Sequence, residues 1–289
     1  MVNTVPAPSE AVSNTMASFV EKYPTLPEGE SLSGSLTLSA LEPPSAIAAL
    51  ERLVPGLEVR IESVPKPDAR TPRRPVTHRI WKYQGRHAVV AVPAPSPQAV
   101  ELLHTVARRW WPHPVAAYDQ AVGLAGLPLD DLLGLLGHVP GRPRDDAEWA
   151  MLHREIPALW PRFAQAWTCL GIAHHQTDEP WANSTRRTVL LDLADGPEDW
   201  VCDAALNAMV AIAWVDPQIR HDVAVAVANR FLDAVEVASH RQITILRSLA
   251  HLTLAAPQMP EEATSLARKL LERRDGTRPR RLRRLFGRS

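Results

Sequence analysis

The sequence lacks several of the motifs that reveal an enzymatic function directly. It has no Gly-rich phosphate loop, no Gly-x-Ser-x-Gly nucleophile turn and no His-Glu-x-x-His pair. The nearest glycine patterns, at 123–126 and 134–137, do not have the neighbouring residues that a phosphate loop requires. The case for an enzyme is therefore weak, and we expect no catalytic residues and no bound cofactor.

Long hydrophobic runs are also missing. No apolar stretch approaches the ~20 residues that span a bilayer. Pro6, Pro8 and Ser9 occupy the region where a signal peptide would have its apolar core. We therefore expect a cytoplasmic protein without a transmembrane segment. Lysine is scarce among the 32 basic residues, which, together with abundant Ala and Pro, indicates a GC-rich bacterial coding sequence.

Cysteine is rare, which argues against a scaffold built on disulfide bonds. The two cysteines, Cys169 and Cys202, both lie in apolar stretches with helical spacing. Their separation matches no zinc-ribbon or zinc-finger pattern. We expect two buried reduced thiols, without a metal ion and without a disulfide between them.

The chain has no net charge, because 32 Lys and Arg residues balance 32 Asp and Glu residues, but the charges are segregated. Residues 268–289 contain ten basic and two acidic residues, so this end carries +8 and the rest of the chain −8. The basic side chains that we single out here are Arg278, Arg280, Arg281, Arg283, Arg284 and Arg288. Together with Leu282, Leu285 and Phe286 they can form one basic amphipathic turn, which suits nucleic-acid phosphates, an anionic membrane or an acidic protein groove. The alternative is a disordered solubilising tail that docks on the acidic body of the protein.

A length of 289 residues with 45% hydrophobic content indicates roughly two domains. We divide the chain into an N-terminal helix and linker (1–32), a small α+β domain (33–111), a helical connector (112–156), paired helices (157–273) and a basic disordered tail (274–289). The expected fold class is mainly α with a small N-terminal α+β module.

A change in the spacing of apolar residues along the sequence predicts the α+β module. Apolar and polar residues alternate in four short stretches, and two stretches between and after them have helical spacing. The expected strands lie near 36–38, 57–61, 76–83 and 86–92, and the expected helices at 45–54 and 96–111. Gln84 and Gly85 separate the last two strands, which therefore read as a hairpin.

After residue 112 nearly every segment has helical spacing, and the expected connector helices lie at 115–125, 129–136 and 145–159. Further on, sliding residues 200–232 by forty places Met209 on Leu249 and Pro217 on Pro257. Asp216 and Pro217 are typical of a helix start, with Asp as the cap and Pro at the first helical position. The run 223–228 alternates Val and Ala like a strand, but its flanks keep helical spacing for over three turns, so we expect a helix there.

This repeat resembles the HEAT/armadillo class of α-helical solenoids, whose units are paired helices of about this period. The resemblance covers residues 157–273. A looser copy of the unit, with its turn at Pro180, precedes the copy at Pro217, and a modified copy with its turn at Pro257 follows it. In that last copy Ala256 replaces the Asp, and the second helix is expected to start later, near Pro260. Proteins of this class mostly serve as interaction scaffolds, so the resemblance implies protein binding and no catalytic residues.

The densest group of possible metal ligands or acid–base residues consists of His174, His175, Asp178 and Glu179. Adjacent side chains on a helix diverge by about 100°, so the two histidines share one ion only if the helix ends between them. The structural alternative is a turn between paired helices, in which Asp178 or Glu179 caps the helix near Pro180. Nine tryptophans are many for this length, and we expect most of them to fill gaps between helices rather than to form a binding face.

These observations lead to one functional hypothesis and two alternatives. The leading hypothesis is a non-catalytic scaffold or adaptor that binds a protein partner through its helical repeats. The first alternative is association with nucleic acid or an anionic surface through the Arg-rich tail. The second is an enzyme whose site lies at the junction of the two halves, which would require titratable residues that converge on a pocket there.

Overall fold

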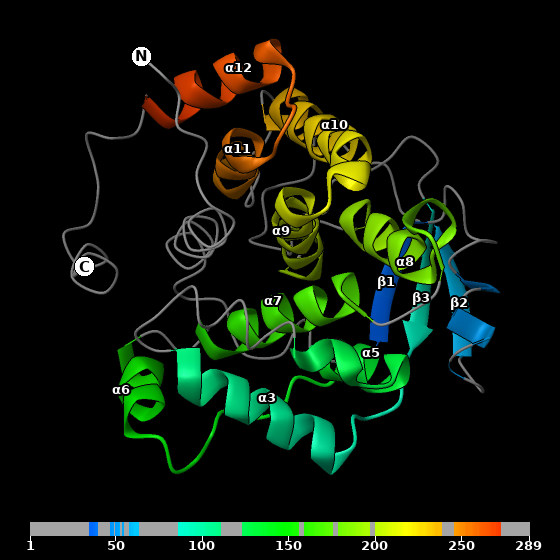
Figure 1. Cartoon of the computed structure of the whole chain (residues 1–289), viewed down its shortest axis with the longest axis vertical. Coiled ribbons are helices and arrows are strands. Elements are labelled where there is room, and N and C mark those ends of the chain that lie inside the picture. The colour runs from blue at the N-terminus through cyan, green and yellow to red at the C-terminus, as the bar shows by residue number, and fades with distance from the viewer. Residues whose placement is uncertain are drawn as a thin grey trace.

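The computed structural model describes most of the chain between residues 86 and 272 and a few shorter stretches before it (Figure 1). The described residues are 35–39, 47–48, 50–52, 54, 58–63, 86–110, 123–155, 159–175, 179–196, 200–238 and 246–272. The N-terminal helix, the strand expected at 76–83 and the basic tail lie outside these residues. So do most of the helix expected at 115–125 and residue Asp178 of the candidate cluster.

Helices make up most of the described chain, which confirms that the fold is mainly α. The α-helices are α3 (Pro97–Trp110), α5 (Leu129–Gly137), α6 (Ala147–Glu155), α7 (Leu159–Ala173), α8 (Thr185–Ala194), α9 (Trp200–Val215), α10 (Arg220–Ala238), α11 (Leu246–Ala255) and α12 (Glu261–Glu272). Short 3-10 turns precede three of them: η1 (Gly123–Gly126), η2 (Trp181–Asn183) and η3 (Pro217–Ile219).

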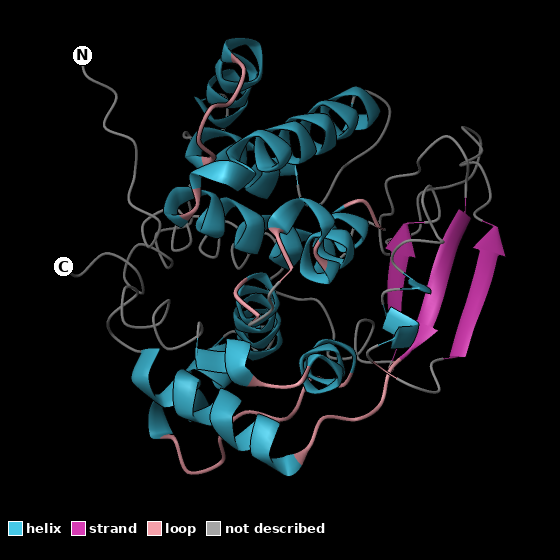
Figure 2. Cartoon of the chain, turned by 45° about the vertical axis from the view of Figure 1, so that its right-hand side comes forward, coloured by secondary structure: helices cyan, strands magenta, loops and turns pink. Residues whose placement is uncertain are grey.

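Three strands form one antiparallel sheet at one side of the helices (Figure 2). They are β1 (Ser35–Ser39), β2 (Glu58–Ser63) and β3 (Arg86–Ala91), and each lies where the alternating pattern predicts a strand. Strand β3 is in the middle, because Val90 pairs with a residue of β1 on one side and a residue of β2 on the other. Val90 is buried, and β1 contacts α5 and α8, so the sheet joins the same core as the helices.

Helix α3 begins after the sheet, and a second helix fixes its start. Both carboxylate oxygens of Asp131 on α5 accept hydrogen bonds from Ser96, from the backbone N–H at 2.6 Å and from the hydroxyl at 2.9 Å. The Ser96 hydroxyl oxygen in turn accepts the N–H of Ala99, as an N-cap does. Pro97 is then the first helical residue, where its missing N–H costs nothing.

The helix expected over 145–159 is shorter than predicted. Helix α6 ends at Glu155, and α7 begins at Leu159. Its start agrees with the sequence, because Asp146 accepts the N–H of Trp149 at 3.0 Å. Residues 156–158 between the two helices lie outside the described part of the chain.

Helices α7 to α12 form three consecutive pairs, α7/α8, α9/α10 and α11/α12 (Figure 1). The first helices of successive pairs contact one another, α7 with α9 and α9 with α11. The second helices do the same, α8 with α10 and α10 with α12. Each second helix also packs on the first helix of the next pair, so the pairs are connected in chain order.

The middle pair confirms two details of the sequence analysis. Asp216 accepts the N–H of Gln218 at 2.9 Å and precedes Pro217, as the expected cap and first residue. The Val-Ala run at 223–228 lies inside α10 and is helical. In the last pair, α12 starts at Glu261, directly after Pro260, as the modified copy of the repeat predicts.

Aromatic residues pack α6 against α7. Trp149, Trp160, Phe163 and Trp167 are all buried and their rings meet mostly edge to face, with centroids 5.2–6.4 Å apart. The polar edges are also used, since Trp160 donates to the carbonyl oxygen of Pro140 at 2.6 Å. For these tryptophans the expected role in the core is confirmed.

Gly134 marks the closest approach between α5 and the segment that follows β3. A Cβ atom added to Gly134 would lie 2.7 Å from the carbonyl oxygen of Pro93 and 2.9 Å from the nitrogen of Pro95. Both of these atoms belong to the backbone, which cannot move aside as the end of a side chain can. Gly123, by contrast, has nothing within 4 Å of the added atom.

We therefore expect Gly134→Ala to destabilise the protein, although alanine is the better helix former. Overpacking costs about 1–3 kcal/mol, against about 1 kcal/mol gained in helix propensity. The net loss should lower the melting temperature by a few degrees. Thermal unfolding of Gly134→Ala and of the control Gly123→Ala checks this. Equal melting temperatures for the two variants would show that the backbone at Pro93 and Pro95 yields easily.

Candidate functional site at the turn between α7 and α8

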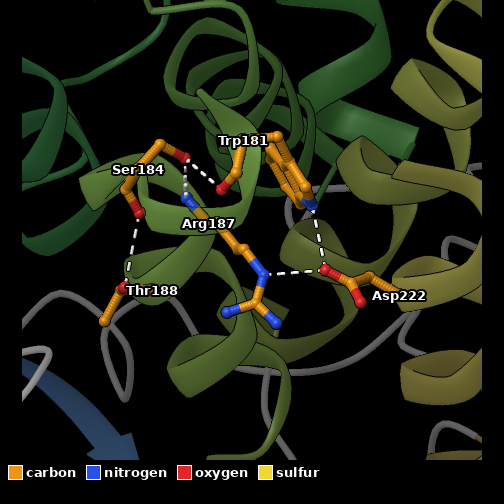
Figure 3. Close-up of polar contacts among 5 residues, drawn as sticks. All are labelled: Trp181, Ser184, Arg187, Thr188 and Asp222. Atoms are coloured by element: carbon orange, nitrogen blue, oxygen red, sulfur yellow. Dashed lines mark hydrogen bonds and ion pairs between the residues drawn. The ribbon is translucent and has the colours of Figure 1, made fainter. Parts of the chain in front are cut away.

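Three of the polar residues singled out in the sequence, His174, His175 and Glu179, lie where α7 ends and the segment before α8 begins. Ser184 is the N-cap of α8, where its hydroxyl oxygen accepts the N–H of Arg187 at 3.2 Å and its hydroxyl donates to the carbonyl of Trp181 at 3.0 Å (Figure 3). Glu179 accepts the N–H of Thr185, the first residue of α8, at 2.7 Å. Hydrogen bonding from the backbone and the side chain of Thr185 lowers the pKa of Glu179. Glu179 therefore has the capping role that the structural alternative predicted.

Asp222 in the first turn of α10 connects this turn to the next helix pair. One of its carboxylate oxygens accepts the indole N–H of Trp181 at 3.1 Å and the Nε–H of Arg187 at 2.7 Å (Figure 3). Burial acts to raise the pKa of Asp222, but the hydrogen bond and charge of Arg187, together with the Trp181 bond, outweigh it. The net effect is a lowered pKa, so Asp222 is ionised at neutral pH.

Arg186 on α8 forms a hydrogen bond with the end of α7. Its Nη1 donates to the carbonyl oxygen of Ala173, the last residue of α7, at 2.7 Å, and its guanidinium lies 5.4 Å from the ring centroid of Trp181. Burial is the main cause that lowers the pKa of this guanidinium. A cation at the last carbonyls of a helix is favourable, because those groups have no partner within the helix.

The two histidines of the candidate cluster have different surroundings. Nδ1 of His175 lies 3.1 Å from the carbonyl oxygen of Ala125 in η1. Burial, and next the charge of Arg186, lower the pKa of His174 below 6.5, so its ring is neutral at physiological pH. Within the described part of the chain, no three His, Cys, Asp or Glu side chains are grouped so that they could hold a metal ion.

His174 and Glu179 thus lie near the same helix connection, and of the two only Glu179 has a described role, as a cap of α8. The residues that organise this turn, Trp181, Arg187 and Asp222, were not among the sequence candidates. Trp181 directly follows Pro180, whereas Asp222 lies five residues after Pro217, so the two do not occupy equivalent positions of the expected repeat. No signal in the sequence pairs them.

The structure describes some of the remaining sequence candidates but not the arginines of the tail. Cys169 and Cys202 are buried thiols on α7 and α9, as expected. Sγ of Cys202 lies 3.2 Å from the carbonyl oxygen of Ala194. Arg278, Arg280, Arg281, Arg283, Arg284 and Arg288 lie outside the described residues. None of the helices that are described is long and apolar enough to cross a bilayer.

We expect Asp222→Ala to destabilise the protein, because it leaves the Trp181 indole and the Arg187 guanidinium without their shared acceptor. The loss should be about 1–2 kcal/mol, near the lower end because the Arg187 and Asp222 side chains are 31% and 33% exposed. Urea unfolding at neutral pH measures it. Asp145→Ala, at an exposed turn before α6, is the control.

A double-variant cycle separates this bond from general damage to α10. Trp181→Phe removes one donor and keeps an aromatic ring, so adding it to Asp222→Ala should cost less than it does alone. Strictly additive losses would contradict a direct bond between Trp181 and Asp222.

Comparison with known proteins identified no relative of this chain. No model of a known protein family matches the chain, and neither the curated proteins nor the solved structures contain a significant match.

Proposed function

We propose that the chain is a non-catalytic scaffold or adaptor that binds a protein partner through HEAT-like helix pairs. The observation that carries this proposal is the order of contacts in α7 to α12. First helices meet first helices, second helices meet second helices, and each pair packs on the next. Such stacking leaves one helix layer available as an extended surface, which is how helical repeats bind their partners.

Equivalent details in two pairs support the repeat. In the first pair Arg186 donates to the carbonyl of Ala173 near the end of α7, and in the second pair Arg220 donates to the carbonyl of Ala213 near the end of α9, at 2.9 Å. Both arginines stand within the first two residues of the second helix. The 3-10 turns before these helices, η2 and η3, also contact each other.

The surface that best suits a partner is on α10. Val225 and Leu232 are 44% and 46% exposed and lie seven residues apart, which places them on one face of the helix. The exposed His221 and Asn229 lie on the same face and surround the apolar side chains with polar groups. An apolar stripe with a polar surround is typical of a protein–protein contact.

A binding experiment with matched variants tests the scaffold proposal. The full chain, the Val225→Glu/Leu232→Glu variant and the Met151→Glu control are immobilised and exposed to extract from the native host. Met151 is 46% exposed on α6, so its variant adds a charge at an equally exposed apolar site away from α10. We expect one protein to be retained by the full chain and the control and reduced at least tenfold on the α10 variant. Equal retention by all three would reject the α10 face, and no specific retention by any of them would reject the scaffold proposal.

Charge segregation supports a second candidate function, association with nucleic acid through the C-terminal tail. Residues 268–289 carry +8 within a chain of zero net charge. Clustered arginines bind phosphates mainly by releasing counterions, without sequence preference.

Replacing Arg280, Arg281, Arg283 and Arg284 by Ala should weaken this binding. Each phosphate contact contributes about one unit to the slope of log affinity against log salt, so the slope should fall by up to about four units. DNA binding at several salt concentrations measures the slope, and thermal unfolding serves as the control for the fold. An unchanged slope would exclude the tail as the phosphate-binding segment.

A further inference from the structure

The exposed face of α10 combines an apolar stripe with an acidic edge. Val225 and Leu232 form the stripe, as described above. Asp222 and Asp233 are half-buried and lie eleven residues apart, which is about three helical turns, so both lie on one side of the helix. The exposed Asn229 lies between the two carboxylates along the chain. The stripe and the acidic edge therefore run side by side along α10.

The basic residues of α10 lie elsewhere on the helix. Arg230 is buried, and Nε of Arg220 donates to the carbonyl oxygen of Ala213 on α9. Arg187 on α8 balances the charge of Asp222 from one side, through one carboxylate oxygen. Among the described side chains of α10, the charged groups on the exposed face are therefore carboxylates.

The C-terminal tail has the complementary chemistry in its sequence. Leu282, Leu285 and Phe286 have the spacing of one side of a helical turn, and four arginines stand between residues 280 and 284. A short amphipathic helix of this kind binds by placing its apolar side on an apolar surface. Opposite charges beside that contact speed association and fix the register of the two segments.

The tail is long enough to reach this face. Helix α12 ends at Glu272 and packs directly on α10 (Figure 1). Residues 273–281 span up to about 30 Å when extended, and α10 with its 19 residues is about 28 Å long. A short tether gives an effective concentration of about 1 mM, so a contact with a dissociation constant of about 0.1 mM is occupied most of the time. One amphipathic turn is therefore enough.

We propose that residues 280–286 dock reversibly on the α10 face of their own chain. The tail then competes with the protein partner for Val225 and Leu232, and binding of the partner releases the arginines of the tail. This competition rests on the scaffold function proposed above, whereas the contact between the tail and α10 requires no partner. The tail is thus an autoinhibitory segment for the surface that binds the partner.

Disulfide trapping in the full chain tests the contact. Asn229→Cys places a thiol beside the stripe, and Ser289→Cys places a second thiol three residues after Phe286. The natural thiols do not interfere, because Cys169 and Cys202 are 0% and 1% exposed. The disulfide fraction in a glutathione redox buffer gives the effective concentration of the two introduced thiols. We expect a disulfide within one chain.

Two further variants of the trapped chain remove the apolar contact from either side. Val225→Ser/Leu232→Ser changes the stripe, and Leu285→Ser/Phe286→Ser changes the tail and keeps every arginine. Each should lower the effective concentration about tenfold, whereas Met151→Ser on α6 should leave it unchanged. An unchanged value in the tail variant would overturn the proposal, and this result stands even if the stripe variant does not fold. A fall in the tail variant without a fall in a folded stripe variant would place the tail elsewhere and also overturn it.

The same experiment separates the tail from other occupants and from the scaffold proposal. A disulfide that links two chains and increases with protein concentration would assign the face to a second copy and overturn the contact within one chain. A high effective concentration that both variants lower, with no protein retained from the host extract, would support the tail contact and reject only the scaffold proposal. Retention of a partner, with an effective concentration that neither variant changes, would reject only the tail contact.

Discussion

The burial of α9 on all sides is the constraint on which the rest of the structure depends. Every residue from 201 to 213 is buried, and the helix packs on α7, α8, α10 and α11. A helix in this position has no polar face to give to water, which explains its nearly continuous apolar sequence. Among the few polar groups that it brings inside, one carboxylate oxygen of Asp203 accepts a hydrogen bond from the hydroxyl of Ser248.

The turns between helices must also supply hydrogen-bond partners, here for the free backbone groups at the helix ends. The second helices of the first two pairs start near side chains that accept hydrogen bonds from the free N–H groups, Ser184 and Glu179 at α8 and Asp216 at η3 before α10. Arginines then occupy the free carbonyls at the end of the preceding helix. The turn between α7 and α8, which attracted attention as a possible metal or acid–base site, is explained by this demand for hydrogen bonds.

The sequence predicted the local features well, because they depend on neighbouring residues. Asp216 with Pro217, the start of α12 after Pro260 and the helix through 223–228 all follow from caps, prolines and helical spacing. Features set by residues far apart in the chain were not predictable in this way. Nothing near Arg187 indicates that Asp222 is its partner, and the order β1-β3-β2 depends on which strand edges meet in space.

Arg230 on α10 is a similar case, because no neighbouring residue in the sequence indicates that this side chain is buried. It donates to the carbonyl oxygen of Gly196, which is 34 residues away in the chain.

The bonds from Trp181 and Arg187 to Asp222 also have a consequence for how the molecule comes apart. A chain of independent helix pairs would lose its ends first and unfold in steps. Here the first pair is bonded to the start of the second, and the indole of Trp214 on α9 donates to the carbonyl of Ala255 at the end of α11, at 3.0 Å. Neither outer pair can separate without breaking a polar bond to the middle pair, so these links couple the three pairs into one cooperative unit.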